Sequence, residues 1–311
     1  MTDSAQSGEP VRAPAPRRES DPAFAAATVG GPAAAPDSPA PPSGAIPDRL
    51  PELGPLPVEP VREGRYEVRA ARTGDELRRA LRLRYEVFNL ELGEGLAASH
   101  ATGLDRDAFD DHVHHLLVID TRDDGIIGTY RMQTLPMARA GLGFYCDGEY
   151  VMDDLPAEIL EQGVEVGRAC IAAAHRKQRV LFALWKGIAA YLAAAGKRYV
   201  FGVCSLTSQD PWEGLAVDAW LREHGHRDDR VRVRARPGLE CLADGPAPDP
   251  LPKAEIPNLF ATYLRFRSVV YGPPVIDREF KTIDFLVVMD TGAFDDTTHA
   301  LFFGPAGRAG S

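Results

Sequence analysis

The chain of 311 residues carries a formal net charge of -10, and 44% of its residues are hydrophobic, a fraction typical of a globular protein. Because a phosphate backbone is bound by a basic surface, this acidic charge argues against a nucleic-acid partner. No apolar run is long enough to span a membrane, and the N-terminus lacks the pattern of a secretory signal. We therefore expect a cytoplasmic protein, and the composition leaves peripheral contact with the inner membrane open.

The four cysteines are too far apart for a zinc site of the usual spacing, so we expect no metal ion. Two of them lie in apolar runs and are expected to be buried thiols, which fits a reducing cytoplasm. The cysteines are Cys146, Cys170, Cys204 and Cys241.

Residues 1–64 differ in composition from the rest, since more than half of the 26 prolines precede residue 61 and are mixed with Ala, Ser and Gly. Such a segment cannot bury enough apolar surface to offset the entropy lost on folding. It is predicted to be a disordered Pro/Ala-rich tail, with a docking arm as the alternative. We expect one folded domain over residues 65–295 and a C-terminal tail over residues 296–311.

The first predicted elements are a strand at residues 66–70, whose side chains alternate in polarity, and an amphipathic helix at 75–88. Thr73 is the predicted N-cap of this helix, and Glu76 completes a capping box. Residues 91–111 are rich in Gly and Asp and are predicted to form a loop over the site.

The rest of the chain predicts a sheet with one long helix packed on it. Strand–helix–strand units place their two strands parallel and adjacent, so part of this sheet is expected to be parallel. In chain order the elements are a hairpin at 115–119 and 126–133, a central strand at 165–171, a helix at 180–195 with Gly196 as its C-cap, a strand at 199–204 and a final buried strand at 283–289.

Five segments in this order resemble the ornithine–acyl-carrier-protein N-acyltransferases, GNAT-superfamily enzymes of ornithine lipid biosynthesis that are often described as hemolysin-like. The segments are Leu83-Arg84-Tyr85-Glu86-Val87-Phe88, Asp107-Ala108-Phe109-Asp110, Gly128-Thr129-Tyr130-Arg131, Glu165-Val166-Gly167-Arg168-Ala169-Cys170-Ile171 and Gly272-Pro273-Pro274-Val275-Ile276-Asp277-Arg278-Glu279-Phe280. The resemblance covers roughly residues 66–295. It implies an α/β (α+β) fold of the GNAT type, a mixed sheet flanked by helices.

The resemblance also implies the activity. A (3-hydroxy)fatty acyl group would pass from acyl carrier protein, the donor and protein partner, to the α-amine of ornithine, the small amino-acid acceptor, with no bound cofactor. The acyl-homoserine-lactone synthases look like more distant relatives, with a similar set of charged and aromatic side chains. The matching positions here are Arg84, Phe88, Asp107, Asp110, Arg131, Glu165 and Arg168.

Two alternatives keep the same fold. The acceptor could be another amine, such as glycine or a substrate of the homoserine-lactone type, because nothing in the sequence fixes it. The chain could also be a non-catalytic GNAT-like module that binds acyl carrier protein, although the presence of Glu165 and Arg168 argues against this.

Glu165 and Arg168 are the candidate catalytic residues, with Glu165 as the candidate general base. An α-amino group has a pKa of about 8, so a nearby carboxylate can hold the ammonium and then remove its proton. A regular strand would place Glu165 and Arg168 on opposite faces, whereas a bulge could bring both toward the cleft, as the resemblance implies. The alternative is a structural Glu–Arg pair.

Asp107 and Asp110 are spaced to share one face of a helical turn and could bind the cationic groups of an amino-acid acceptor, with an N-cap as the alternative. Arg131 is expected to pair with Asp110. Arg84 and Phe88 are assigned to the acceptor site by the resemblance. Glu91 follows the first helix and could neutralise an acceptor amine, or it could be an ordinary loop charge.

The basic turn that precedes the long helix replaces the glycine-rich, pyrophosphate-binding turn usual in acetyl-CoA enzymes of this superfamily. Cations at a helix N-terminus cost a few tenths of a kcal/mol each, which favours an anionic visitor such as the phosphate of a pantetheine arm over a plain solvated turn. The predicted carrier-binding residues are His175, Arg176, Lys177 and Arg179.

Overall fold

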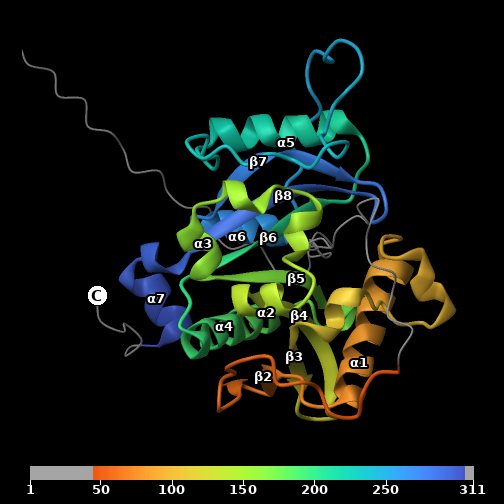
Figure 1. Ribbon diagram of the computed structural model, residues 1–311, viewed down its shortest axis with the longest axis vertical. Helices are drawn as coiled ribbons and strands as arrows, with labels where there is room; N and C mark the ends of the chain where they lie inside the picture. Colours follow the sequence, from red (N-terminus) through yellow and green to blue (C-terminus); the bar gives the residue numbers. More distant parts are fainter. Residues whose placement is uncertain (1–44, 305–311) are drawn as a thin grey trace, which may run out of the picture.

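A computed structural model describes residues 45–304 (Figure 1). The predictions of a disordered tail over residues 1–44 and of a C-terminal tail over residues 305–311 therefore lie outside the described part of the chain. One mixed sheet of eight strands runs through the fold in the order β1-β2-β3-β4-β5-β6-β8-β7. Only the β5–β6 pair is parallel, as predicted. The strands are β1 (Val61–Glu63), β2 (Tyr66–Ala70), β3 (His114–Asp120), β4 (Gly125–Thr134), β5 (Gly163–Ile171), β6 (Tyr199–Leu206), β7 (Val269–Asp277) and β8 (Thr282–Asp290).

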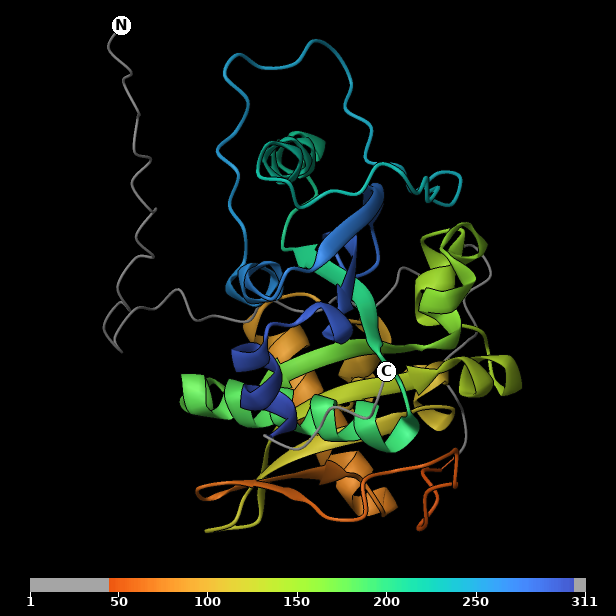
Figure 2. The same cartoon turned by 90° about the vertical axis from the view of Figure 1, so that its left-hand side faces the viewer.

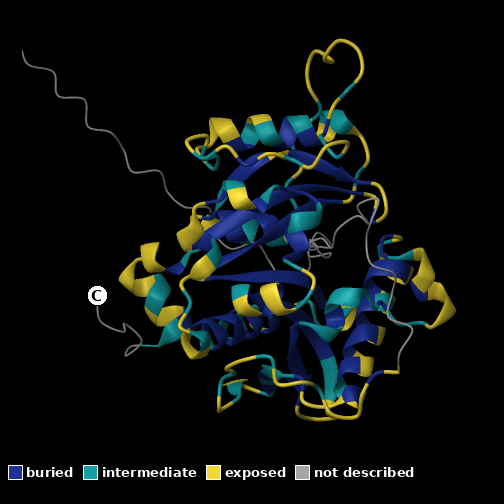
Figure 3. Cartoon of the chain, viewed as in Figure 1, coloured by how far each residue is buried: buried dark blue, intermediate teal, exposed yellow. Residues whose placement is uncertain are grey.

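Helices cover both faces of this sheet, whose strands form the buried centre of the molecule (Figure 3). They are α1 (Gly74–Tyr85), α2 (Leu135–Ala140), α3 (Ala157–Glu161), α4 (Gln178–Ala195), α5 (Pro211–Glu223), α6 (Asn258–Arg265) and α7 (Asp296–Phe303). The predicted caps are confirmed: Thr73 and Glu76 form a capping box at α1, and Gly196 ends α4 with a left-handed φ of 61°. None of the helices among residues 45–304 is both long and apolar enough to cross a membrane.

Alternation along β3 sends successive side chains to two different helices. Leu116 and Val118 pack in the main core with α4, whereas Leu117 and Ile119 pack with Ala80 of α1. Helices α4 and α1 therefore lie on opposite faces of the sheet (Figure 2). Gly187 allows α4 to approach closely, since a Cβ added there would lie 2.4 Å from Val68 Cγ1.

Strand β5 contains the predicted bulge. Thr129 of β4 faces Cys170 and Arg131 faces Gly167, so a single β4 residue opposes both Arg168 and Ala169. The backbone of Arg168 has a φ of 52°, in the left-handed region. Such a bulge bends the strand and re-aims the side chain at the irregular position.

The two parallel strands, β5 and β6, pair over only three residues each. The β5–β6 ladder joins Gly163–Glu165 to Tyr199–Phe201 and then stops, although both strands continue for several residues. The last residue of β5 that pairs with β6 is Glu165. The β5–β6 ladder therefore ends at the centre of the sheet, beside the residue predicted to be the general base.

Two expectations about the ends of the folded domain need correction, and one strand at the edge of the sheet was not predicted. Ordered structure begins before residue 65, because β1 pairs with β2 and Ile46 is buried. Residues 296–303 form helix α7, whose Phe302 packs against Trp185 of α4, and are not a tail. Strand β7 was not predicted, because Pro273 and Pro274 cannot donate ladder hydrogen bonds; it lies at the sheet edge, with a register shift at these residues.

Candidate active site

Three arginines and three aspartates form a closed network beside the β5 bulge. Arg84 of α1 binds Asp105 (2.8 Å) and Asp110 (2.6 Å). Arg168 binds Asp105 (3.2 Å) and Asp107 (3.0 Å). Arg131 of β4 binds Asp107 (2.7 Å) and lies 3.5 Å from Asp110, which confirms the predicted Arg131–Asp110 pairing.

The network balances its own charge in a buried place. Five of the six side chains are at most 4% exposed, and Asp107 is 14% exposed. Burial alone would raise the pKa of Asp110, but the charges of Arg84 and Arg131 outweigh it and hold this pKa well below its usual range. Each aspartate is shared between two guanidinium groups.

This arrangement changes the interpretation of two predicted site residues, Asp107 and Asp110. Asp107 and Asp110 were expected to bind a cationic acceptor, yet both are already neutralised by arginine and also form the capping box of the short 3-10 helix Ala108–Asp111. The N-cap alternative therefore describes the contacts of this pair. Asp105, which the sequence analysis missed, is fully buried between Arg84 and Arg168 and completes the network.

Aromatic rings surround the network. The Arg168 guanidinium lies 4.0 Å from the ring centroid of Phe280 and 6.0 Å from that of Phe88, which is buried. Arg131 lies 4.3 Å from the ring centroid of Tyr145. These contacts place Phe88, which was assigned to the acceptor site, beside the network, and they connect the network to the turn between β7 and β8.

Glu165 is buried at the point where β5 and β6 separate, and its carboxylate is held by backbone. Its two oxygens accept hydrogen bonds from the N–H groups of Tyr145 (2.8 Å) and Cys146 (2.7 Å). Burial raises the pKa of Glu165 to about 7, although these two hydrogen bonds lower it. The sequence did not predict these partners, and they give Glu165 a second role, because through them it anchors the 3-10 helix Tyr145–Gly148.

One residue of the predicted carrier-binding turn forms an ion pair that the sequence did not reveal. Arg176 pairs with Glu91, which was assigned to the acceptor, and also donates to the Ile171 carbonyl. Lys177 and Arg179 are exposed at the start of α4. Arg179 also lies 3.9 Å from Glu63 but is 67% exposed, so the accessible positive charge of this turn comes mainly from Lys177 and Arg179.

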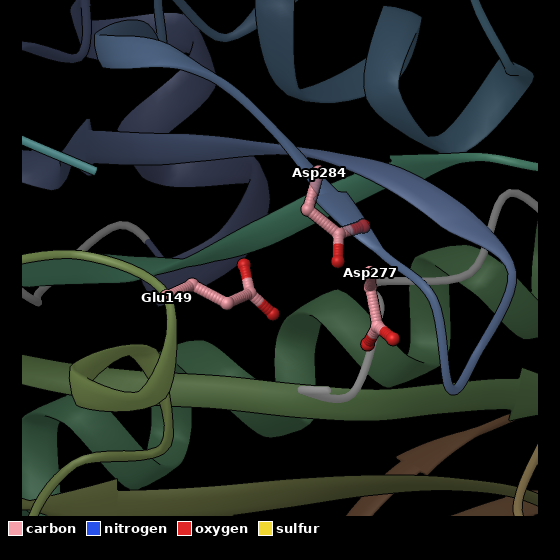
Figure 4. Close-up of side chains that lie close together, drawn as sticks. All are labelled: Glu149, Asp277 and Asp284. Atoms are coloured by element: carbon pink, nitrogen blue, oxygen red, sulfur yellow. The ribbon is translucent and has the colours of Figure 1, made fainter. Parts of the chain in front are cut away.

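A second polar group, unpredicted from the sequence, lies near Glu165. Glu149 follows the helix that Glu165 anchors, Asp277 ends β7 and Asp284 lies on β8. Their carboxylates face a common space (Figure 4), and one oxygen of each lies within 4.8 Å of the others. Such a group has the geometry to hold a cation, and no sequence spacing indicated it because three separate elements contribute.

These three carboxylates are at most 1% exposed, and four of their oxygens have no hydrogen-bond partner within residues 45–304. Burial raises the pKa of Asp277 to about 8, with Asp284 as a further cause. Burial likewise raises the pKa of Asp284 to about 6 and that of Glu149 well above its usual range. A clue existed in the sequence: Asp284 interrupts an otherwise apolar strand.

The fold and the family match agree on the class of protein. The mixed sheet with separating parallel strands belongs to a GNAT-type N-acyltransferase, and residues 83–186 match the acetyltransferase (GNAT) domain family. The crystal structure of the AHL synthase LasI aligns over 77% of this chain and 95% of its own, with 11% identity and a TM-score of 0.41.

Sequence relatives narrow the class to a family. The L-ornithine N(alpha)-acyltransferase of Rhodobacter capsulatus is 33% identical over 239 residues, which are 74% of this chain and 92% of that enzyme. The enzyme of the same name from Rhizobium meliloti is 31% identical over 256 residues, 79% of this chain and 86% of its own. The chain belongs to the L-ornithine N(alpha)-acyltransferase family, which confirms the resemblance seen in the sequence.

Proposed function

We propose that this N-acyltransferase moves a fatty acyl group, 3-hydroxyacyl groups included, from acyl carrier protein to the α-amine of L-ornithine, the first step of ornithine lipid formation. The observation that carries the proposal is a set of buried carboxylates at the centre of the fold. Glu165, whose pKa is raised, lies at the end of the β5–β6 ladder, and three further carboxylates have oxygens without a hydrogen-bond partner among residues 45–304. Buried carboxylates of this kind suit an acceptor with two amines. The names of the relatives support the choice of ornithine.

In the proposed reaction the α-nitrogen attacks the thioester carbonyl, so that a C–N bond forms and the C–S bond breaks. The ammonium must first lose a proton, for which we assign Glu165. Each of its oxygens accepts one backbone N–H and keeps a second lone pair, so a proton can still be received. A base with a pKa of about 7 is half ionised at neutral pH.

The donor is proposed to arrive at the N-terminal turn of α4. Lys177 and Arg179 are exposed there and can meet both the pantetheine phosphate and the acidic surface of a carrier protein. The product would carry a single acyl chain, which gives marginal and reversible membrane affinity. A cytoplasmic enzyme with peripheral contact with the inner membrane is therefore part of the proposal.

A transfer assay tests this proposal. Purified protein is incubated with 3-hydroxyacyl carrier protein or the matching acyl-CoA, and with ornithine, lysine, glycine or homoserine lactone, and the products are identified by mass spectrometry. We expect N-acylornithine from the carrier-protein donor at the highest rate. A product formed faster from glycine or homoserine lactone would contradict the proposed acceptor, and equal rates with acyl-CoA would contradict the proposed donor.

A further inference from the structure

The carboxylates of Glu149, Asp277 and Asp284, here called the acidic cluster, are arranged as a site that lacks its positive charge (Figure 4). Asp277 Oδ1 accepts the backbone N–H groups of Glu279 and Phe280 (2.8 Å each), and Asp284 Oδ2 lies 3.3 Å from Thr282 Oγ1. The remaining oxygens have no donor among the described residues: both of Glu149, Oδ2 of Asp277 and Oδ1 of Asp284. The anchored oxygens hold Asp277 and Asp284 in place, and one oxygen of each of the three carboxylates lies within 4.8 Å of the others.

A fourth polar side chain, that of Ser205, adjoins the carboxylates. Ser205 of β6 lies directly opposite Asp284 in the β6–β8 register, so the two side chains share one face of the sheet. Ser205 is 2% exposed, and its hydroxyl has no hydrogen-bond partner in residues 45–304. The hydroxyl is near enough to Asp284 to moderate the rise in its pKa that burial causes. A buried hydroxyl and four buried oxygens without donors are costly unless a donor completes them.

We infer that the acidic cluster and Ser205 bind the side-chain ammonium of the acceptor and so select a diamino acid over a neutral amino acid. An ammonium group has three N–H donors, and the cluster presents one free carboxylate on each of three sides. The inference rests on the proposed function and deepens it by assigning the second amine of the acceptor.

The connection between the cluster and Glu165 supports this assignment. Cys146 donates its N–H to Glu165, and the Cys146 carbonyl accepts the N–H of Glu149 (3.1 Å). One turn of 3-10 helix, about 6 Å along its axis, therefore separates Cys146, which binds the proposed proton acceptor, from Glu149 of the cluster. An acceptor with amines at both ends of a short aliphatic chain can present one amine to each carboxylate site.

Binding measured without any acyl donor tests the inference separately from the transfer reaction. Isothermal titration calorimetry at neutral pH compares L-ornithine with L-norvaline, which has the same carbon chain without the terminal amine. We expect the wild-type protein to bind ornithine at least about 30-fold more tightly. Asp284→Asn should lower ornithine affinity by about 10–100-fold and reduce the preference over norvaline by a similar factor.

Two further variants distinguish a loss of ornithine binding from a folding defect. Ser205→Ala removes a single hydroxyl, keeps all three carboxylates and should lower ornithine affinity by a smaller factor, about 3–10-fold. Asp290→Asn makes the same charge change at the other end of β8, where the carboxylate pairs with Arg198, and should keep the wild-type preference.

Three outcomes would overturn the inference. The first is equal affinity of the wild-type protein for ornithine and norvaline. The second is an equal loss of affinity for both ligands in Asp284→Asn and Ser205→Ala, which would mean a structural role. The third is binding of Mg²⁺ that Asp284→Asn abolishes while ornithine binding is unchanged, which would make the cluster a metal site. The transfer assay decides the proposed function separately, because it measures turnover and this titration measures acceptor binding alone.

Discussion

Glu165 combines two features that usually exclude each other. Its carboxylate is fixed by two backbone N–H groups, yet burial raises its pKa to about 7. The backbone contacts fix its position without supplying a full counter-charge, so the group stays easy to protonate near neutral pH. A residue of this kind can organise the site and accept a proton in the same structure.

The pH profile of Glu165→Gln separates these two roles. In the wild-type enzyme, kcat/KM for ornithine should rise with pH through about 7, because the base works only when ionised. Glu165→Gln should lower kcat/KM by about 100-fold or more and remove this ascending limb. Steady-state kinetics from about pH 5.5 to about pH 8.5 provide the measurement. A slow variant that keeps the same limb would assign Glu165 to positioning alone.

At the scale of elements, the arginine–aspartate network joins α1, β4, β5 and the loop before β3. Asp105 is its most buried member and binds Arg84 and Arg168 at once. Breaking such a pair leaves a guanidinium group buried without its counter-charge, which is far more costly than losing a surface ion pair.

Asp105→Asn should therefore lower the free energy of unfolding by about 3–5 kcal/mol, measured by urea denaturation. The matched control is Asp111→Asn, which removes a half-exposed carboxylate paired with Arg106 in the same loop and should cost less than about 1 kcal/mol. Equal losses in the two variants would mean that the network contributes nothing special to stability.

The start of α4 is the element assigned to the donor. Lys177→Glu combined with Arg179→Glu should weaken binding of acyl carrier protein by about tenfold or more at low salt, and the difference should shrink as salt screens the charges. Surface plasmon resonance at several salt concentrations measures this. Arg78→Glu, an exposed position on α1 across the sheet, is the control. A double variant that binds like this control would remove the docking site from α4.

Periodicity predicted most central elements because a two-sided sheet and an amphipathic helix each repeat their buried positions at a fixed spacing. Helix α4 and strands β5 and β6 follow this rule. Strand β7 escaped prediction because its two prolines are tolerated only at an edge, which is a property of the whole sheet. The pairing of Glu91 with Arg176 escaped for a similar reason, since 85 residues separate them.

The candidate active site was likewise predicted only in part. The resemblance identified Arg84, Arg131 and Arg168, and the structure brings them together. It did not identify the acidic cluster, whose members are isolated carboxylates on three elements and gain meaning only from their burial and mutual distance. Sequence spacing reports neighbours along one element, and this cluster forms between elements.

For the molecule as a whole, the acidic cluster predicts how stability depends on pH. The pKa values of Asp277 and Asp284 are raised in the folded state to about 8 and about 6, so the folded chain holds protons that the unfolded chain releases. Their contribution to stability is therefore present at acidic pH and is lost as the pH rises from about 4 to about 8.

Asp284→Asn should reduce this loss, because it removes one of the mutually repelling carboxylates. The fall in Tm between about pH 5 and about pH 8, followed by differential scanning calorimetry, should be smaller in Asp284→Asn than in the wild-type protein. Asp290→Asn, whose carboxylate pairs with Arg198, should show the wild-type fall. A steeper fall in Tm with pH in Asp284→Asn would contradict this prediction, because it would show that ionisation of the cluster does not destabilise the folded protein.

The position of the acyl group on the product tests the central claim most directly, because the proposed site holds the side-chain amine in the acidic cluster and presents the α-amine to the thioester. Ornithine is reacted with the acyl carrier protein donor, and the product is fragmented in a tandem mass spectrometer. We predict acylation at the α-nitrogen with a free terminal amine. A product acylated at the terminal nitrogen, or no product at all, would contradict the claim.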